Sequence, residues 1–324
     1  MTVSTGNWFG LVETDLEQMT DNLQNLVAAK HPVLKEAAEY LFRVKGKRVR
    51  PAIVLLASRA TASKGMLTDR HRRLAEITEM IHTAGLVHDD VIDTSDLRRG
   101  MDTVNAHFTN KIAVLAGDFL FAKSSVYLSR LGSLEVVELL ATVLEHFGEG
   151  EILQSVRQFD PTLTFEEYID KSFYKTASLL ANSAKAAAVL SDSPRDVCEA
   201  LYDYGKHLGI AFQIVDDILD FTGSTAVLGK PAGSDLQEGH LTAPALFALE
   251  EHPQLAVLIE GGFANNGDFE SALKLIHASR GISRSRELAQ AHARQAVQVL
   301  EVLPQSPARQ ALSDLSDYVL DRLY

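Results

Sequence analysis

The sequence predicts an all-α protein with a single large helical domain over residues 1–324, of which about residues 1–10 form a flexible N-terminal segment. Three observations support this fold class. Only 9 of the 324 residues are proline, and they mark junctions between apolar runs. Runs that alternate with the period of a β-strand are scarce. Apolar residues instead recur three and four apart on one helix face, as at Val136, Leu139, Leu140, Val143 and Phe147.

Local signals divide the chain into about a dozen helices. Residues 131–133 read Leu-Gly-Ser and predict a short turn between two helices. Ser193-Pro194 predicts a helix start with proline at the first helical position. Loops are expected over residues 98–102 and 223–236. No low-complexity linker interrupts this series, so we expect one domain.

The composition excludes several classes of protein. The formal net charge of -12 argues against nucleic acid as a partner. The single cysteine, Cys198, rules out a disulfide framework within the chain and indicates a reducing compartment. No basic residue precedes Lys30, so no signal or transit peptide is expected. Because no uninterrupted apolar stretch is long enough to span a bilayer, we expect a cytoplasmic protein with at most peripheral membrane contact.

A five-residue acidic pattern, Asp-Asp-x-x-Asp, occurs twice, each time after an apolar, helix-like run. Its members are Asp89, Asp90, Asp93 and Asp216, Asp217, Asp220. Residues three and four apart share a helix face, so the first and last aspartates stack and the middle one lies on the flank. Mg²⁺ prefers oxygen ligands and completes its shell with waters and phosphates. One copy is typical of a solvated helix end, but two copies with apolar fillers indicate a metal–diphosphate site.

Basic and polar residues near these motifs are candidates for phosphate contacts, although each also has an ordinary structural interpretation. Lys47 and Arg50 lie three apart before a helix start, and the alternative is a basic surface cluster. Arg98 and Arg99 follow the first motif, where they would otherwise balance the charge of nearby aspartates. Lys230 lies after the second motif and is equally typical of a solvated loop.

Four further side chains complete the candidate site. Lys175 and Thr176 offer a charge and a hydroxyl late in a helix-like segment, although a solvated lysine and a buried threonine are the simpler interpretation. His82 lies seven residues before Asp89 on the same face, where a lone histidine is more often a satisfied core residue. Gln213 lies three before Asp216 and faces the same way if that aspartate faces a cavity.

Together these motifs resemble the trans-type, head-to-tail isoprenyl diphosphate synthases. The resemblance runs from about residue 20 to the C-terminus, and the two aspartate motifs with their Arg-Arg tail are its most specific part. The matching segments are Gly46–Pro51, His88–Gly100, Gly117-Asp118, Lys175-Thr176, Gly209–Phe221 and Gly229-Lys230. Residues 239–244, Gly-His-Leu-Thr-Ala-Pro, are most similar to the long-chain solanesyl-type enzymes.

The resemblance implies an isoprenoid synthase fold around a central apolar cavity, a homodimer, and roughly two or three Mg²⁺ per active site. It assigns Mg²⁺ and the allylic diphosphate to the six motif aspartates. It assigns further allylic diphosphate contacts to Arg98, Lys175 and Lys230, isopentenyl diphosphate contacts to Lys47, Arg50, His82 and Arg99, and the lining of the carbocation region to Thr176 and Gln213. His240 departs from the pattern, because many relatives carry lysine there; one phosphate contact is therefore in doubt or pH-sensitive.

The resemblance also implies the reaction: an allylic diphosphate ionises, isopentenyl diphosphate attacks the cation, and a proton is lost. Residues on the helix before the first motif would set product length. Ala84 and Gly85 are small where short-chain relatives commonly carry aromatics, and Ile77 and Ile81 lie further back. One helical turn of about 5.4 Å is comparable to one isoprene unit, so an open face predicts a long product, with C45 solanesyl diphosphate for a quinone side chain expected. Ala84 and Gly85 would alternatively serve only close helix packing.

Four competing interpretations stay open at this point. A geranylgeranyl or other shorter-chain synthase would share every motif. A class I terpene cyclase shares the helical fold and first motif, but usually carries an Asn/Ser/Glu-type second motif and needs no isopentenyl site. A non-catalytic subunit of a heteromeric synthase would tend to lack part of the aspartate machinery, which is complete here. A calcium-binding EF-hand is disfavoured because the acidic segments lack its alternating ligands and central glycine.

Overall fold

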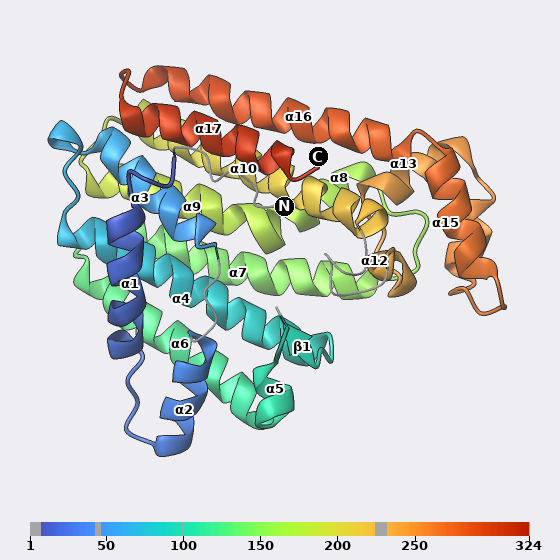
Figure 1. Ribbon diagram of the computed structural model, residues 1–324, viewed down its shortest axis with the longest axis horizontal. Coiled ribbons are helices and arrows are strands. Elements are labelled where there is room, and N and C mark those ends of the chain that lie inside the picture. Colours follow the sequence, from blue (N-terminus) through green and yellow to red (C-terminus); the bar gives the residue numbers. More distant parts are fainter. Residues whose placement is uncertain (1–7, 43–46, 99, 224–231, 324) are drawn as a thin grey trace. The chain divides into compact units, whose positions relative to one another are not determined.

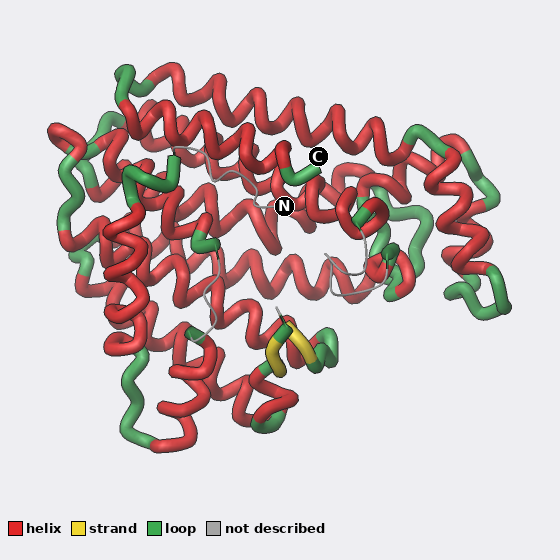
Figure 2. Tube along the Cα trace, in the orientation of Figure 1, coloured by secondary structure: helices red, strands yellow, loops and turns green. Residues whose placement is uncertain are grey.

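The computed structural model describes residues 8–42, 47–98, 100–223 and 232–323, and these are almost wholly helical (Figures 1 and 2). Helix accounts for 77% of the chain and strand for 1%, which confirms the all-α prediction. The described residues contain more helices than the dozen expected, because one-turn helices such as α5 (Val104–His107) and α12 (Ser234–Gln237) are too short to show a periodic pattern.

The remaining helices are longer. In the first half of the chain they are α1 (Glu13–Leu26), α2 (Pro32–Leu41), α3 (Val49–Thr61), α4 (Asp69–Ile92), α6 (Asn110–Arg130) and α7 (Leu134–Val156), with a 3₁₀ turn at Ser63–Gly65. In the second half they are α8 (Phe165–Ser172), α9 (Ser178–Leu190), α10 (Arg195–Thr222), α13 (Ala243–Glu251), α14 (Leu255–Glu260), α15 (Asp268–Ala278), α16 (Gly281–Val299) and α17 (Pro307–Asp321). A π-helix at Phe173–Ala177 joins α8 to α9, and a 3₁₀ turn at Leu300–Val302 follows α16.

The contacts divide the chain into two compact units, each assembled from separate stretches of sequence. Unit 1 comprises residues 1–142, 182–202 and 300–314, and unit 2 comprises residues 143–181, 203–299 and 315–324. The first aspartate motif belongs to unit 1 and the second to unit 2. A single domain over the whole chain stays a prediction.

Most expected junctions fall where the sequence placed them. α6 ends at Arg130 and α7 begins at Leu134, so the turn at residues 131–133 is confirmed. α10 begins at Arg195, one residue later than predicted, because the carbonyl of Pro194 already accepts the first helical hydrogen bond from the Cys198 N–H at 3.1 Å. The loop expected over residues 223–236 ends early, since α12 begins at Ser234; residues 224–231 lie outside the described ranges.

Arg98, Met101 and Asp102, expected in a loop, lie in the strands of a two-stranded antiparallel sheet, drawn in yellow in Figure 2. β1 (Leu97–Arg98) and β2 (Met101–Asp102) pair Leu97 with Asp102 and Arg98 with Met101. Gly100 has a φ of 77°, a left-handed conformation that glycine adopts readily in such a turn. Two-residue strands are too short for an alternating pattern, which is why the sequence did not reveal them.

In unit 1, α4 packs along α6 (Figure 1). Gly117 permits the close approach, because a Cβ there would lie 2.2 Å from Nε2 of His88. The His88 ring donates from Nε2 to the carbonyl of Val114 at 3.0 Å, so α6 fixes α4 one residue before the first aspartate. At its other end α4 begins with a capping box, in which Thr68 accepts from the N–H of His71 at 3.4 Å.

In unit 2, α10 packs against the π-helix and the start of α9 through small residues. A Cβ on Gly209 would lie 2.4 Å from Cα of Ala177, and one on Gly205 would lie 2.6 Å from Cα of Ala181. Glycines four apart on α10 therefore meet alanines four apart on the facing segment. This contact fixes α10 against the segment that carries Lys175 and Thr176.

Among the described helices, α6 has the length and composition of a membrane span, although Asp118 and Lys123 interrupt it. Only 33% of its most apolar 18-residue stretch is buried. A soluble core helix passes the same test of length and composition, but it is usually mostly buried. α6 therefore exposes more apolar surface than a core helix of a soluble protein usually does.

Candidate functional site

The first aspartate motif forms the C-terminal end of α4, as predicted. Asp93 follows the last helical residue and is exposed, Asp89 is half-buried, and Asp90 is buried at 4% relative exposure. The middle aspartate thus differs from the two that stack one turn apart, in line with its expected place on the flank.

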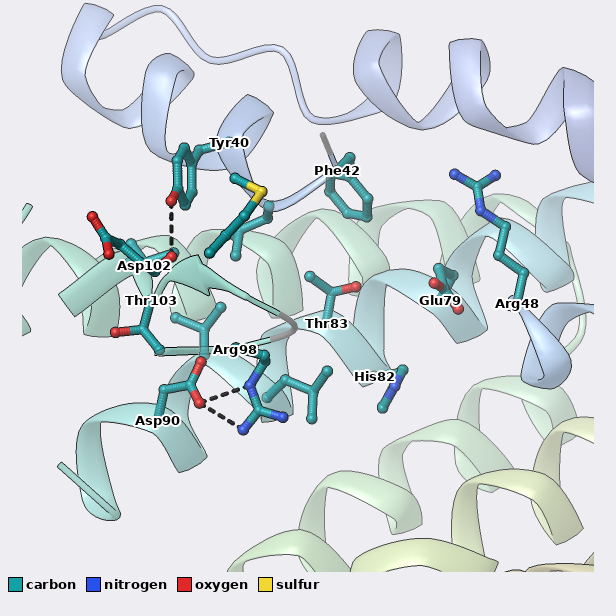
Figure 3. Close-up of a pocket in the computed structure, with 15 residues that line it drawn as sticks. Tyr40, Phe42, Arg48, Glu79, His82, Thr83, Asp90, Arg98, Asp102 and Thr103 are labelled. Atoms are coloured by element: carbon teal, nitrogen blue, oxygen red, sulfur yellow. Dashed lines mark hydrogen bonds and ion pairs between the residues drawn. The ribbon is translucent and has the colours of Figure 1, made fainter. Parts of the chain in front are cut away.

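Arg98 from the hairpin neutralises Asp90 (Figure 3). Its Nε and Nη2 both donate to Oδ1 of Asp90, at 2.7 and 2.6 Å. The side chain of Arg98 is 37% exposed and that of Asp90 is 6% exposed, so the carboxylate is paired where water reaches little of it. We expected both groups to contact Mg²⁺ or diphosphate; in this structure they bind each other and anchor the hairpin to α4.

Further hydrogen bonds hold the segment after the motif. The hydroxyl of Thr103 and Nδ2 of Asn105 both donate to the carbonyl of Ser95, at 2.7 and 3.0 Å. The hydroxyl of Tyr40 donates to the carbonyl of Asp102 at 2.8 Å. These bonds fix the position of the chain segment that follows the acidic C-terminal end of α4.

A pocket lies beside this helix end in unit 1 (Figure 3). His82, Asp90 and Arg98 line it, so three of the predicted site residues meet there. Its wall also contains apolar side chains from three elements, Phe42, Leu86 and Met101. Lys47, which is exposed, and Arg50, which is half-buried, are at the start of α3 and do not line it. Arg99 lies outside the described residues.

Arg48 and Glu79 add opposite charges to this pocket, and neither was among the predicted site residues (Figure 3). Arg48 has a φ of 50°, which is unusual for a residue with a side chain and is typical of functional sites. Its Nη1 donates to the carbonyl of Leu16 at 3.1 Å. Burial lowers the pKa of Arg48, and the negative charge of Glu79 partly offsets this. The basic cluster before Pro51 was the sequence signal for Arg48.

The four residues expected to set product length lie on α4 before the motif. Ile77, Ile81 and Ala84 are fully buried, and Gly85 is half-buried. These four positions of α4 carry no aromatic residue, and their part in setting product length stays a prediction.

The second motif lies in the last turns of α10 and is tied into a hydrogen-bonded chain within unit 2. Thr176 donates from its hydroxyl to Oε1 of Gln213 at 2.7 Å, and Nε2 of Gln213 donates to Oδ1 of Asp217 at 2.8 Å. The hydroxyl of Tyr168 donates to the other carboxylate oxygen, Oδ2, at 2.6 Å. Three predicted site residues, Thr176, Gln213 and Asp217, are therefore in direct contact.

The carboxyl group of Asp217 is buried at 2% relative exposure. Burial, together with the charge of Asp235, raises its pKa to about 7, while the charge of Lys171 and the bonds from Tyr168 and Gln213 act in the opposite direction. Asp217 is thus poised between its neutral and charged forms near neutral pH.

The other two aspartates of this motif have different partners. Oδ1 of Asp216 forms an ion pair with Nη2 of Arg322 at 2.7 Å, and its side chain is 38% exposed. Asp220 is buried; it accepts from the hydroxyl of Ser234 at 2.8 Å and from the N–H of Asp235 at 3.3 Å. Asp220 therefore fixes the start of α12, whereas Asp216 keeps an accessible carboxylate.

Lys175 projects from the π-helix, a local distortion that often occurs at functional sites. Its Nζ donates to Oε2 of Glu151 at 2.6 Å, and both side chains are about four-fifths buried. Gly150 makes room for this contact, because a Cβ there would lie 2.8 Å from Cγ of Lys175. Lys230 lies outside the described residues.

The sequence did not indicate Tyr168, Glu151 or Arg322. Tyr168 lies 49 residues from its partner Asp217, and Arg322 belongs to neither motif. No local spacing links these residues to an aspartate, so only packing reveals them.

The carboxylates suit Mg²⁺ in their chemistry. Within the described ranges, no three His, Cys, Asp or Glu side chains are close enough to hold a metal ion by themselves. Asp89, Asp93 and Asp216 retain partly or fully exposed oxygen donors. Mg²⁺ is usually bound by one or two carboxylates together with waters and substrate phosphates, so this donor set fits a metal held jointly by protein and phosphate.

Comparison with known proteins identifies relatives over nearly the whole chain. The Polyprenyl synthetase family matches residues 31–276. A prenyl transferase of Synechocystis sp. is 63% identical over 99% of this chain and 100% of its own length. The chloroplastic solanesyl diphosphate synthase 1 of Arabidopsis thaliana is 52% identical over 99% of this chain and 80% of its own. A polyprenyl synthase from Caulobacter crescentus, crystallised with calcium and isoprenyl diphosphate, has a TM-score of 0.91 at 34% identity and covers 100% of this chain and 99% of its own.

Proposed function

The chain belongs to the polyprenyl synthetase family and is a prenyltransferase, and we propose that it condenses isopentenyl diphosphate with farnesyl or geranylgeranyl diphosphate to form a long-chain all-trans polyprenyl diphosphate. The best expectation for the product is C45 solanesyl diphosphate, the product named for the plant relative. The observation that carries the proposal is the duplicated aspartate pattern, each copy of which ends a long helix.

In this proposal both aspartate motifs act on one allylic diphosphate. Asp89, Asp93 and Asp216 would hold Mg²⁺, and Lys175 would contact the same diphosphate. When bound, Mg²⁺ neutralises the diphosphate charge and makes the group a better leaving group. The Caulobacter crescentus neighbour was crystallised with calcium, another divalent cation that prefers oxygen ligands, and with isoprenyl diphosphate, which supports a metal–diphosphate site. Mg²⁺ dependence and the number of ions stay predictions.

The chemistry then needs a polar patch that stabilises positive charge without capturing it. The allylic C–O bond breaks, the double bond of isopentenyl diphosphate forms a new C–C bond to C1, and a proton leaves C2 of the added unit for the released pyrophosphate. The hydrogen bond from Thr176 to Gln213 holds both dipoles in place, and both lie within a buried chain that includes Asp217. We assign them to the wall beside the carbocation, where fixed dipoles are most effective.

Isopentenyl diphosphate would occupy the pocket in unit 1. His82 and Arg48 line that pocket beside Arg98, which keeps its proposed contact with the allylic diphosphate. Lys47 and Arg50 lie nearby in sequence at the start of α3, and they are proposed to reach the diphosphate group when it is bound. Arg99 and Lys230 keep the roles that the family resemblance implies.

The decisive experiment incubates the purified chain with radiolabelled isopentenyl diphosphate and either farnesyl or geranylgeranyl diphosphate, with and without Mg²⁺. The products are dephosphorylated and sized by chromatography. A ladder ending near C45 that requires Mg²⁺ supports the proposal, and a C20 product selects the shorter-chain alternative. Hydrocarbons from geranylgeranyl diphosphate alone indicate a cyclase, and no turnover by the homomeric chain indicates a non-catalytic subunit.

Ala84→Phe tests the product-length assignment. The aromatic ring adds a block on a buried face of α4, where one helical turn of about 5.4 Å matches one isoprene unit. The product should become shorter by several isoprene units while the first condensation continues. Ala84→Ser, which keeps the side chain small, should preserve the wild-type product; an unchanged ladder in Ala84→Phe contradicts the assignment.

We also propose that α6 forms a homodimer interface. Leu115, Ala122 and Val126 are exposed and spaced seven and four residues apart, so they share one face of α6. Leu115→Asp should convert a dimer to a monomer in sedimentation analysis, whereas Lys274→Asp on the exposed face of α15 should not. Recovery of the wild-type chain with membranes instead of as a soluble dimer would contradict this. A cytoplasmic location stays a prediction.

A further inference from the structure

Two lysines one helical turn apart, Lys171 and Lys175, lie at the junction of α8 and the π-helix in unit 2. Lys175 is paired with Glu151 at 2.6 Å. Lys171 differs, because among the described residues it has no ion pair within 4.0 Å and no hydrogen bond. Its Nζ lies 5.7 Å from the centre of the Tyr168 ring, the same ring whose hydroxyl binds Asp217.

The surroundings of Lys171 make an unpaired cation costly. Burial lowers its pKa, the charge of Lys175 acts in the same direction, and the charges of Asp217, Asp235 and Glu151 offset part of this effect. Lys171 is half-buried, and an ammonium group that is partly removed from water normally has a hydrogen-bonded counter-charge. A cation held without one is suited to a ligand that brings its own negative charge.

Position 240 belongs to the same group of charges but carries no positive charge at neutral pH. Burial, together with the nearby Lys171, lowers the pKa of His240 to about 4. The backbone N–H of His240 donates to the carbonyl of Asp235 at 2.8 Å, and the carbonyl of Gly239 accepts from the N–H of Phe159 at 2.9 Å. These bonds hold His240 beside α12, in the region that Asp220 organises.

We propose that Lys171 is a further contact for the diphosphate group of the allylic substrate, and that it supplies the positive charge that His240 does not. This inference rests on the proposed function. Lys171 lies one helical turn before Lys175. Two lysines of one continuous helical segment would therefore bind the same diphosphate group. His240 is then an uncharged neighbour of the diphosphate group, and the two lysines supply the positive charge that binds it.

Calorimetric titration of the full-length chain with inorganic pyrophosphate and Mg²⁺ tests the proposal. Lys171→Met should raise the Kd about tenfold, the effect of one lost charge-assisted hydrogen bond. Lys171→Arg, which keeps the charge, should stay near wild type. Lys274→Met on the exposed face of α15 is the matched control and should leave the Kd unchanged.

The double variant Lys171→Met/His240→Lys makes the test specific, because it returns a cation to position 240. It should recover most of the lost affinity, and the KM for the allylic diphosphate should follow the Kd more closely than kcat does. An unchanged Kd in Lys171→Met overturns the inference. So does a Kd increase that accompanies a fall in Tm and is not reversed by His240→Lys, because that pattern assigns Lys171 a structural role.

Failure of the proposed function would be seen separately. The condensation assay on the wild-type chain reports whether isopentenyl diphosphate is consumed, independently of any Lys171 variant. A wild-type chain that is inactive in that assay refutes the prenyltransferase proposal and this inference with it. A wild-type chain that is active, with Lys171→Met indistinguishable from it in Kd and KM, refutes the inference alone.

Discussion

Asp90 on α4 and Asp217 on α10 hold the same place in the same five-residue pattern, yet their surroundings differ. Asp90 is paired with a cation, the Arg98 guanidinium. Asp217 is held by two uncharged donors, Tyr168 and Gln213. One carboxylate faces a guanidinium at hydrogen-bond distance, whereas burial raises the pKa of the other to about 7. Identical motifs therefore acquire different electrostatic properties from partners outside the motif.

The outer aspartates differ between the two motifs as well. Asp93 is exposed beyond the end of α4. Its counterpart Asp220 is buried and organises the start of α12 through Ser234 and Asp235. The last aspartate of the first motif is therefore exposed to solvent, whereas the last aspartate of the second motif is buried and hydrogen-bonded to α12.

The largest expected effect tests what the two motifs have in common. Asp89→Asn and Asp216→Asn should each lower kcat/KM by about a thousandfold, because each removes a metal-binding charge. The double variant should be little worse than either single variant if both serve one diphosphate group. Steady-state assays at saturating Mg²⁺ measure this.

Asp69→Asn in the first turn of α4 is the control for this prediction and should retain activity. Fully multiplicative losses in the double variant would mean that the two motifs act independently.

A second prediction concerns the protonation state of Asp217. Its folded pKa of about 7 lies above the ~3.9 of an unfolded aspartate. Between these values the folded chain holds a proton that the unfolded chain has released, so this contribution to stability is complete below about pH 4 and is lost as the pH rises to about 7. Asp217→Asn is uncharged throughout, so it should gain stability relative to wild type across that window, by on the order of 2–4 kcal/mol.

Urea denaturation in the presence of EDTA, from about pH 5 to about pH 8, checks the sign and the window. The same denaturation measurements on Asp90→Asn and wild type are the control, because the Asp90 carboxylate of the wild-type chain is paired with Arg98. A difference between Asp217→Asn and wild type that does not change with pH would contradict the account.

A third prediction separates the two kinds of partner. Arg98→Leu leaves the buried carboxylate of Asp90 without its cation and should lower the free energy of unfolding by about 2 kcal/mol, a value reduced because the guanidinium is partly exposed. Tyr168→Phe removes one neutral donor from Asp217 and should cost about 1 kcal/mol. High salt should shrink the first loss and leave the second unchanged.

The double variant Asp90→Asn/Arg98→Leu is the control for this prediction, because it removes the unpaired charge and should recover part of the stability. Equal salt dependence for Arg98→Leu and Tyr168→Phe would remove the distinction between the two environments.

The smallest expected effect concerns the far end of the hydrogen-bonded chain in unit 2. Thr176→Val removes the hydroxyl that donates to Gln213 and should cost about 1 kcal/mol or less of stability. It should lower kcat more than Thr176→Ser, which keeps the hydroxyl. If Thr176→Val and Thr176→Ser have the same kcat, the hydroxyl has no part in stabilising the carbocation.

The sequence was enough to predict the helical class, the turn at residues 131–133, and the position of each aspartate motif at the C-terminal end of its helix. These features follow from helical periodicity and local turn chemistry, which are expressed within a few residues. The sequence placed Thr176 and Gln213 in one region but did not show that they contact each other. Residue spacing defines the helix face on which a side chain lies, and it does not identify the residue that the side chain contacts.

The packing of the chain was needed to show that Arg98 binds Asp90 through a short hairpin, that Tyr168 binds Asp217, and that Arg322 reaches Asp216. Tyr168 and Arg322 are remote in sequence from their partners and belong to no motif. The protonation of Asp217 depends on burial, which arises when α8 and α10 pack together. Charge and hydrogen bonding at a buried group are properties of its whole surroundings, and a local pattern of residue types does not contain them.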